Sequence, residues 1–164
     1  MTAIMGVTRM DMETWIELLG KSQDDPAVKA ALATAGVKKI PKLRKDEFTV
    51  IFDLKGHGMS LIMTDEAWLK SLEDQDIGEG PLILTSVAAY FVRRKSKDLY
   101  KGALPYKLAA SVTQADLRKK FGPPAETGTD IPYDIWLRGG LEVTAGYTND
   151  LKLEHFQLKV PRSE

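Results

Sequence analysis

A chain of 164 residues with 43% hydrophobic and 28% charged residues has the composition of one folded domain, not of a disordered segment. Its 23 basic and 23 acidic residues cancel, so no overall field attracts nucleic acid or an anionic membrane, and a charged partner must be met by a local patch. The absence of cysteine excludes disulfides, thiolate zinc sites and thiol nucleophiles.

Neither a signal sequence nor a membrane helix is apparent. Residues 1–12 have no basic stretch before an apolar core, and Arg9 and Asp11 interrupt the apolar residues that are there. The longest apolar run, 87–92, is far shorter than the roughly 20 residues of a membrane helix. We therefore expect a cytoplasmic protein that does not contact a membrane.

The first third of the chain predicts two helices and a hairpin. Apolar residues recur at helical spacing over 11–19, and a proline opens an alanine-rich run over 26–35. Residues 47–54 alternate between apolar and polar, and a Gly-His-Gly turn separates them from 59–63. We expect helices in the first two segments and paired strands in the last two.

The middle of the chain changes character twice. Residues 64–80 are acidic, and we expect a loop there with at most one helical turn. In 81–93 both faces of an extended chain are apolar or small, which predicts a long strand inside a sheet. Gly102 and Pro105 then mark a turn before the next element.

The C-terminal part begins with a well-delimited helix over 113–121. Thr113 can cap its start and Gly122 can end it, since the two prolines that follow prevent continuation. Three β runs joined by short turns follow, at 131–137, 141–147 and 151–160.

These elements predict an α+β fold in one domain, 1–164. We expect an antiparallel sheet of six or more strands, with two N-terminal helices and one helix before a C-terminal three-stranded meander. A helix followed by antiparallel strands occurs at about 8–63 and again at 110–160, which suggests a weak internal repeat. Chance similarity is the alternative.

Residues for catalysis or cofactor binding are scarce. His57 and His155 do not have a metal-ligand spacing, and no Gly-x-Ser-x-Gly motif offers a nucleophile. The Gly-x-Gly pairs at 56–58 and 78–80 lack the third glycine of a nucleotide-binding loop and fit turns that need positive φ. We expect no catalytic residue, no cofactor and no metal.

Two sets of residues are candidates for contact with a partner. The first is the acidic segment, in which Trp68 could anchor a basic partner, although a solvated loop is the plainer reading. It comprises Asp65, Glu66, Trp68, Glu73, Asp74, Asp76 and Glu79. Basic clusters at 38–45 and 93–97 suit sheet edges, and a nucleic-acid role would require both on one face.

The second set is Asp134 with Trp136. Alternation along the strand places these two on one face and an apolar group on the other: Ile131, Tyr133, Ile135 and Leu137. The apolar face would turn inward, so Asp134 and Trp136 would turn outward. An outward tryptophan is either covered by a helix or free for contact, and the sequence leaves both open.

Several short motifs, taken together, resemble a family. They are Leu-Leu-Gly-x4-Asp-Pro at 18–26, Gly-His-Gly-x-Ser-Leu at 56–61, Tyr-x-Gly-x-Leu-Pro at 100–105, and Phe-Gly-Pro-Pro with Tyr-Asp-x-Trp and a final Tyr-x-x-Asp hairpin. In this order the chain resembles small immunity-type proteins encoded beside bacterial secreted or contact-delivered toxins. Its helix, Phe-Gly-x-Pro and meander unit is also similar to half of the tandem-repeat fold of β-lactamase inhibitor proteins and related outer-membrane lipoproteins, whose lipidated cysteine is absent here.

The resemblance implies a protein that binds and neutralises a cognate toxin in the producing cell, and a basic toxin domain would suit the acidic segment. A generic scaffold or regulatory interaction module is the alternative. A third reading is an enzyme in which Asp134 acts with Glu142 or His155 on neighbouring strands. A homodimer through the edge of the last strand stays open, although the charged residues along that strand argue against it: Lys152, Glu154 and Lys159.

Overall fold

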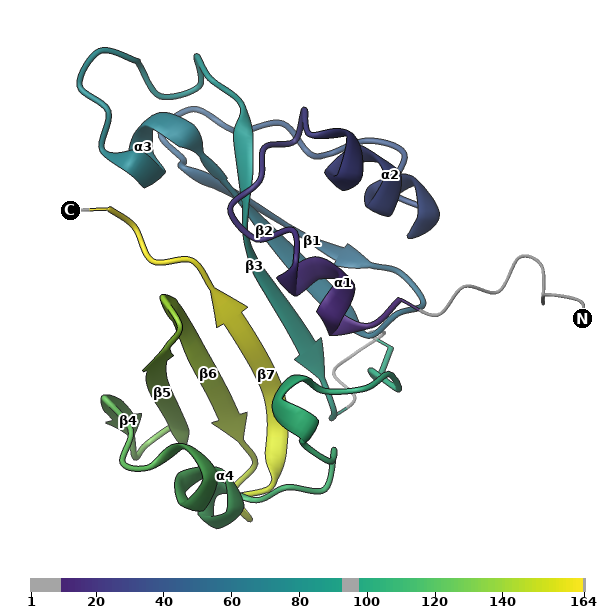
Figure 1. Ribbon diagram of the computed structural model, residues 1–164, viewed down its shortest axis with the longest axis vertical. Helices are drawn as coiled ribbons and strands as arrows, with labels where there is room; N and C mark the ends of the chain where they lie inside the picture. Colours follow the sequence, from purple (N-terminus) through teal and green to yellow (C-terminus); the bar gives the residue numbers. More distant parts are fainter. Residues whose placement is uncertain (1–9, 93–97, 164) are drawn as a thin grey trace, which may run out of the picture.

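The computed structural model describes residues 10–92 and 98–163 (Figure 1). The helical elements are α1 (Met12–Ile16), α2 (Pro26–Thr34), α3 (Glu66–Lys70), the 3₁₀ turn η1 (Pro105–Lys107) and α4 (Gln114–Phe121). The strands are β1 (Thr49–Leu54), β2 (Met59–Asp65), β3 (Leu82–Tyr90), β4 (Glu126–Gly128), β5 (Tyr133–Arg138), β6 (Leu141–Tyr147) and β7 (Leu153–Lys159). The α+β prediction is confirmed. Among the described helices, none combines the length and the apolar character that a membrane span requires.

Within the described residues the strands form one seven-stranded antiparallel sheet in the order β1-β2-β3-β7-β6-β5-β4. It consists of two three-stranded meanders, β1-β2-β3 and β5-β6-β7, joined where β3 pairs with β7, for example at Ala88 and Gln157. The meander predicted for the C-terminal part is confirmed, and β4 is an extra strand at its outer side. Whether the two halves arose by duplication stays a prediction.

Strand β7 is central, so the prediction that the last strand has a free edge was wrong. The outer strands are β1 and β4. The charged residues Glu154 and Lys159 do not mark β7 as an edge strand, because side chains project from the faces of a sheet, not from its edges. A central strand can therefore carry charge wherever one face is left uncovered.

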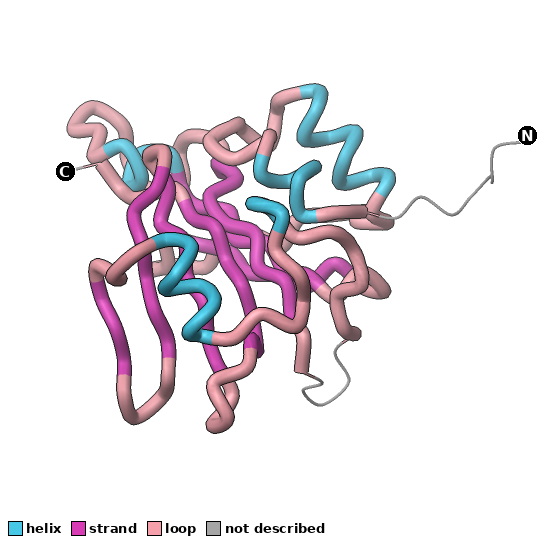
Figure 2. Tube along the Cα trace, turned by 60° about the horizontal axis from the view of Figure 1, so that its bottom comes forward, coloured by secondary structure: helices cyan, strands magenta, loops and turns pink. Residues whose placement is uncertain are grey.

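The main hydrophobic cluster lies on one face of the sheet. Figure 1 shows α1, α2 and α4 in front of the strands, and Figure 2 shows the same layer from a second direction. Trp15 of α1 and Leu117 of α4 are fully buried against the sheet residues Leu61, Val87 and Phe156 in one hydrophobic cluster. The opposite face, which we call the open face, has no helix of this layer over it.

Local signals explain the helix boundaries. Asp25 caps α2 by accepting a hydrogen bond from the Ala27 N–H at 2.8 Å. Thr113 caps the start of α4, as predicted, in a reciprocal capping box with Asp116, and Gly122 ends the helix with a φ of +86°. Helix α1 is shorter than the predicted 11–19 because the chain leaves it to pair with β3, where the Gly20 N–H donates to the Leu84 carbonyl at 2.7 Å.

Strand β4 was not predicted. It has three residues, follows two prolines and carries no apolar alternation, so neither its length nor its pattern distinguishes it from a loop. It exists because β5 offers it a partner, with Thr127 opposite Asp134.

The basic cluster at 93–97 lies outside the described residues.

Candidate partner-binding surface

The acidic segment folds into α3 followed by a loop over 71–80, which we call the acidic loop. Asp65 organises both parts. One carboxylate oxygen caps α3 by accepting from the Trp68 N–H at 3.1 Å, and the other accepts from the Gly78 N–H at 2.7 Å. Asp65 is fully buried, so its assignment as a contact residue was wrong, since its cap and clamp roles require it to point inward.

Glu66 is engaged within the chain. Its carboxylate accepts from the Lys70 ammonium at 3.1 Å and from the Gln75 amide at 3.2 Å. These hydrogen bonds, the Lys70 one foremost, lower the pKa of Glu66 against the opposing effect of burial. Glu66 therefore helps to hold the start of the loop to its middle.

Four carboxylates of the acidic loop remain on the surface: Glu73, Asp74, Asp76 and Glu79. Glu79 closes a turn by accepting from the Asp76 N–H at 2.9 Å. In the described residues no lysine or arginine lies within ion-pair distance of any of the four. The loop is thus a fixed, exposed group of negative charges.

Trp68 already has partners within the chain. The Phe48 ring stacks on it, with 5.1 Å between centroids and an interplanar angle of 8°. The Arg162 guanidinium lies 4.2 Å from the indole centroid and donates to the Trp68 carbonyl at 2.6 Å. The C-terminal segment is further held by the Ser163 N–H, which donates to Leu69 O at 2.9 Å. Trp68 is half-buried. Its main role is to hold the C-terminal segment, and it is not a free anchor for a partner.

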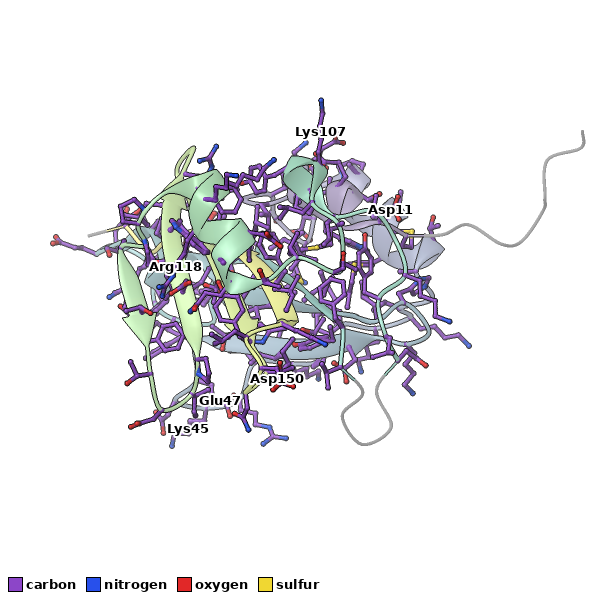
Figure 3. All side chains as sticks on the ribbon, turned by 90° about the horizontal axis from the view of Figure 1, so that it is seen from below. Asp11, Lys45, Glu47, Lys107, Arg118 and Asp150 are labelled. Atoms are coloured by element: carbon purple, nitrogen blue, oxygen red, sulfur yellow. The ribbon has the colours of Figure 1, made fainter. Side chains whose placement is uncertain are left out.

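A basic segment lies beside the acidic loop. Its cations are all exposed: Lys38, Lys39, Lys42, Arg44 and Lys45. A groove of about 700 Å³ separates the two, lined by Arg44 and Lys45 on one side and by Ile77 and Gly78 on the other. Figure 3 shows Lys45 projecting from the molecule together with Glu47. This end of the molecule therefore presents both signs of charge.

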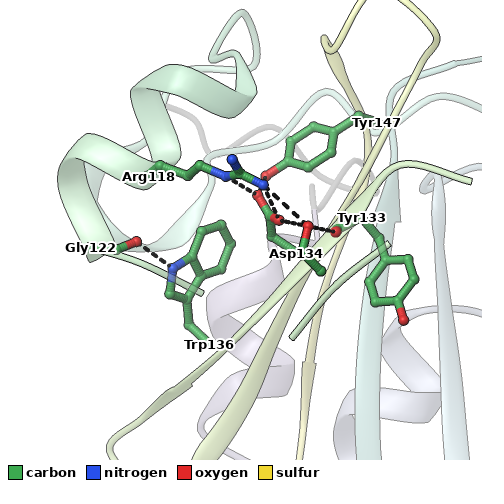
Figure 4. A network of polar contacts seen from close by, with 7 residues as sticks. Arg118, Gly122, Tyr133, Asp134, Trp136 and Tyr147 are labelled. Carbon is green, nitrogen blue, oxygen red and sulfur yellow. Dashed lines mark hydrogen bonds and ion pairs between the residues drawn. The ribbon is translucent and has the colours of Figure 1, made fainter. Parts of the chain in front are cut away.

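Asp134 is the centre of a buried polar network (Figure 4). Arg118 of α4 donates to both carboxylate oxygens, from Nε at 2.9 Å and from Nη2 at 2.8 Å. Thr127 of β4 donates at 2.8 Å and Tyr147 of β6 at 2.9 Å. Four hydrogen bonds saturate the carboxylate and tie α4, β4 and β6 to β5.

The network shifts two pKa values in opposite directions. Burial alone would raise the pKa of Asp134, but the hydrogen bonds from Arg118, Thr127 and Tyr147 outweigh it and hold that pKa below its usual value. Burial and the Asp134 carboxylate raise the pKa of Tyr147 far above its usual value. Asp134 is therefore an ionised structural group and Tyr147 a permanent hydrogen-bond donor.

Asp134 and Trp136 were wrongly assigned as contact residues. Both are buried, and the Trp136 indole N–H donates to the Gly122 carbonyl at the end of α4 at 2.9 Å. The two faces of β5 are the reverse of those predicted: Ile131 is 78% and Leu137 is 68% exposed. Alternation shows which residues share a face but not which face the helix covers, and here the buried aspartate is paired with the Arg118 guanidinium.

The reversal also removes the proposed catalytic pairing. Asp134 lies on the helix-covered face, opposite Ala145 of β6. Glu142 and His155 alternate with inward residues of β6 and β7 and lie on the open face. The sheet itself therefore separates Asp134 from both. In the described part of the chain no cluster of three or more histidine or carboxylate residues could hold a metal ion.

A hollow of about 520 Å³ at one end of the open face was not predicted. A register shift between β6 and β7 places Glu154 and His155 side by side on its wall, with 3.9 Å between Glu154 Oε1 and His155 Nδ1. Gly146 makes room for this, because a Cβ there would collide with the His155 ring. A glycine inside a strand is the signal that could have indicated the bulge.

No family model and no curated protein matches the chain. Among solved structures it is similar to a DUF4309 family protein, YjgB, from Bacillus subtilis. The TM-score is 0.43 at 15% sequence identity, over 80% of this chain and 76% of that one.

Proposed function

We propose that this is a non-catalytic binding protein, and more specifically an immunity protein that binds and neutralises a cognate toxin in the cell that produces both. The observation that carries the proposal is the acidic loop. It presents the carboxylates of Glu73, Asp74, Asp76 and Glu79, which no described cation neutralises.

The loop is suited to binding because its shape is set before a partner arrives. Asp65 joins its far end to α3 through the Gly78 N–H, and Gln75 joins its middle to Glu66. A loop that is already ordered loses less conformational entropy on association. Its charges would steer a basic surface into contact and speed association at low salt.

The toxin as partner comes from the resemblance to immunity-type proteins, and the charge of the loop supports a basic toxin domain. The resemblance also implies that inhibition needs binding alone. We therefore expect one-to-one binding and no turnover of the toxin.

The test is co-expression with the product of the adjacent open reading frame. Cells that express the toxin should survive only when this protein is also present, and the purified pair should form a one-to-one complex. If the folded protein gives no rescue, the immunity proposal is wrong.

Charge reversal then tests the surface. The double variant Asp74→Lys and Asp76→Lys should slow association about tenfold at low salt, with a smaller effect at high salt. The matched control reverses Asp130 and Asp150, which are also exposed but lie at the other end of the sheet. Equal effects of the two doubles would show that the acidic loop is not the contact.

A further inference from the structure

Strand β1 is an outer strand of the sheet and is long enough to pair again. It has six residues and, within the described part of the chain, one neighbouring strand, β2. The other outer strand, β4, has three residues and follows two prolines, which limits it as a pairing edge. An outer strand exposes a row of backbone donors and acceptors on its free side.

We propose that β1 pairs antiparallel with β1 of a second copy of this chain, with Ile51 on the two-fold axis. The pairing would join two seven-stranded sheets edge to edge. It does not depend on the proposed function, because the acidic loop is a different surface.

Symmetry restricts the register. In a two-fold antiparallel pair, opposite residues lie on the same face of the joined sheet, so the axis must pass through a residue and not between two residues. The candidates near the middle of β1 are Val50, Ile51 and Phe52.

Charge selects among the three. An axis at Ile51 places Glu47 of each copy opposite Lys55 of the other, since each lies four positions from Ile51. An axis at Val50 places Lys55 opposite Lys45 and Asp53 opposite Glu47, which are like charges. An axis at Phe52 places Asp53 opposite Ile51 and brings no opposite charges together.

Exposure supports the same axis. Ile51 is 65% exposed although its neighbour Val50 belongs to the core. On the axis, the two Ile51 side chains would lie directly opposite each other on the open face and cover one another. The charges that flank β1 would discourage pairing with unrelated strands and permit this one.

A single cysteine tests the register directly, because the natural chain has none. Opposite residues of an antiparallel pair have Cα atoms about 4.5–5.5 Å apart, within the range of a disulfide. Ile51→Cys should therefore form a disulfide-linked dimer under mild oxidation. Thr49→Cys, which would face Asp53 of the other copy, and Leu137→Cys, which is equally exposed on β5, should do so much more slowly.

Sedimentation of the intact chain over a concentration series tests the association itself. Wild type should show a monomer–dimer equilibrium. Glu47→Lys and Lys55→Glu alone should each weaken the dimer by about threefold or more, and together they should restore it, since each pair occurs twice. A monomer at every concentration would overturn the proposal. So would a dimer in which Ile51→Cys links no faster than Leu137→Cys.

Discussion

Replacing Asp134 by asparagine is the sharpest test of how the C-terminal half is held together. Asparagine keeps the size of the side chain, but it removes the charge and turns one acceptor into a donor that faces Arg118. The Tyr147 hydroxyl, which is buried, or the guanidinium then loses its acceptor.

The size of the effect follows from the contacts. Breaking a buried ion pair costs about 3–5 kcal/mol, and leaving a buried hydroxyl without a partner costs about 1–3 kcal/mol. The Arg118 side chain is 41% exposed, so water recovers part of its loss. We therefore expect the free energy of unfolding to fall by about 2–4 kcal/mol, which lowers Tm by about 5–15 °C in a chain of this size.

Urea unfolding followed by tryptophan fluorescence measures this, since Trp136 lies on the same strand and face as Asp134. Asp130→Asn, an exposed change in the turn before β5, serves as control and should stay within about 0.5 kcal/mol of wild type. A loss below about 0.5 kcal/mol for Asp134→Asn would refute the role assigned to the network.

The pH dependence gives a second reading of the same variant. The folded-state pKa of Asp134 lies below that of the unfolded chain, about 3.9. The stabilisation by ionised Asp134 is therefore fully present above that pH and is lost as the pH falls toward the folded-state pKa. The difference in stability between wild type and Asp134→Asn should stay constant from pH 7 to about 5 and narrow below about pH 4. A gap unchanged down to pH 2 would contradict this account.

Three further changes can be followed by the same unfolding assay. Gly58→Ala should lower the free energy of unfolding by several kcal/mol more than Gly56→Ala. Both glycines have positive φ, so alanine is strained by about 1 kcal/mol at either position. Only at Gly58 would a Cβ also collide with neighbouring backbone. Equal losses would show that the close approach at Gly58 is relaxed. Trp136→Phe should lower the free energy of unfolding by about 1–2 kcal/mol more than Trp15→Phe. The Trp136 change removes the hydrogen bond to the Gly122 carbonyl, whereas the Trp15 indole N–H is buried without an acceptor in the described residues. The reverse order would argue against that assignment. Arg162→Ala should leave global stability within about 1 kcal/mol but speed hydrogen exchange at the Ser163 amide, and unchanged exchange would show that the C-terminal segment is held by other contacts.

The candidate surface was only partly predictable. The exposed carboxylates of the acidic loop follow from local composition, because a run of like charges stays in solvent wherever it is placed. Asp65 belongs to the same run, yet it is buried, since its position just before α3 makes it a cap. Trp68 could not be assigned from its neighbours in sequence, because Phe48 and Arg162 reach it from distant parts of the chain.

Local patterns by themselves determined the type and place of most helices and strands. The capping box at Thr113, the positive φ at Gly122 and the apolar length of β3 are each decided within about ten residues. Alternation also showed correctly which residues of β5 share a face.

Only the tertiary structure decided which face of β5 turns inward and which strands lie at the edges. Both depend on contacts between segments far apart in the chain: Arg118 of α4 supplies the cation that lets Asp134 be buried, and β3 pairs with β7 to place the last strand in the centre. A strand's own alternation is unchanged when the strand is turned over or moved, so its sequence cannot distinguish these arrangements.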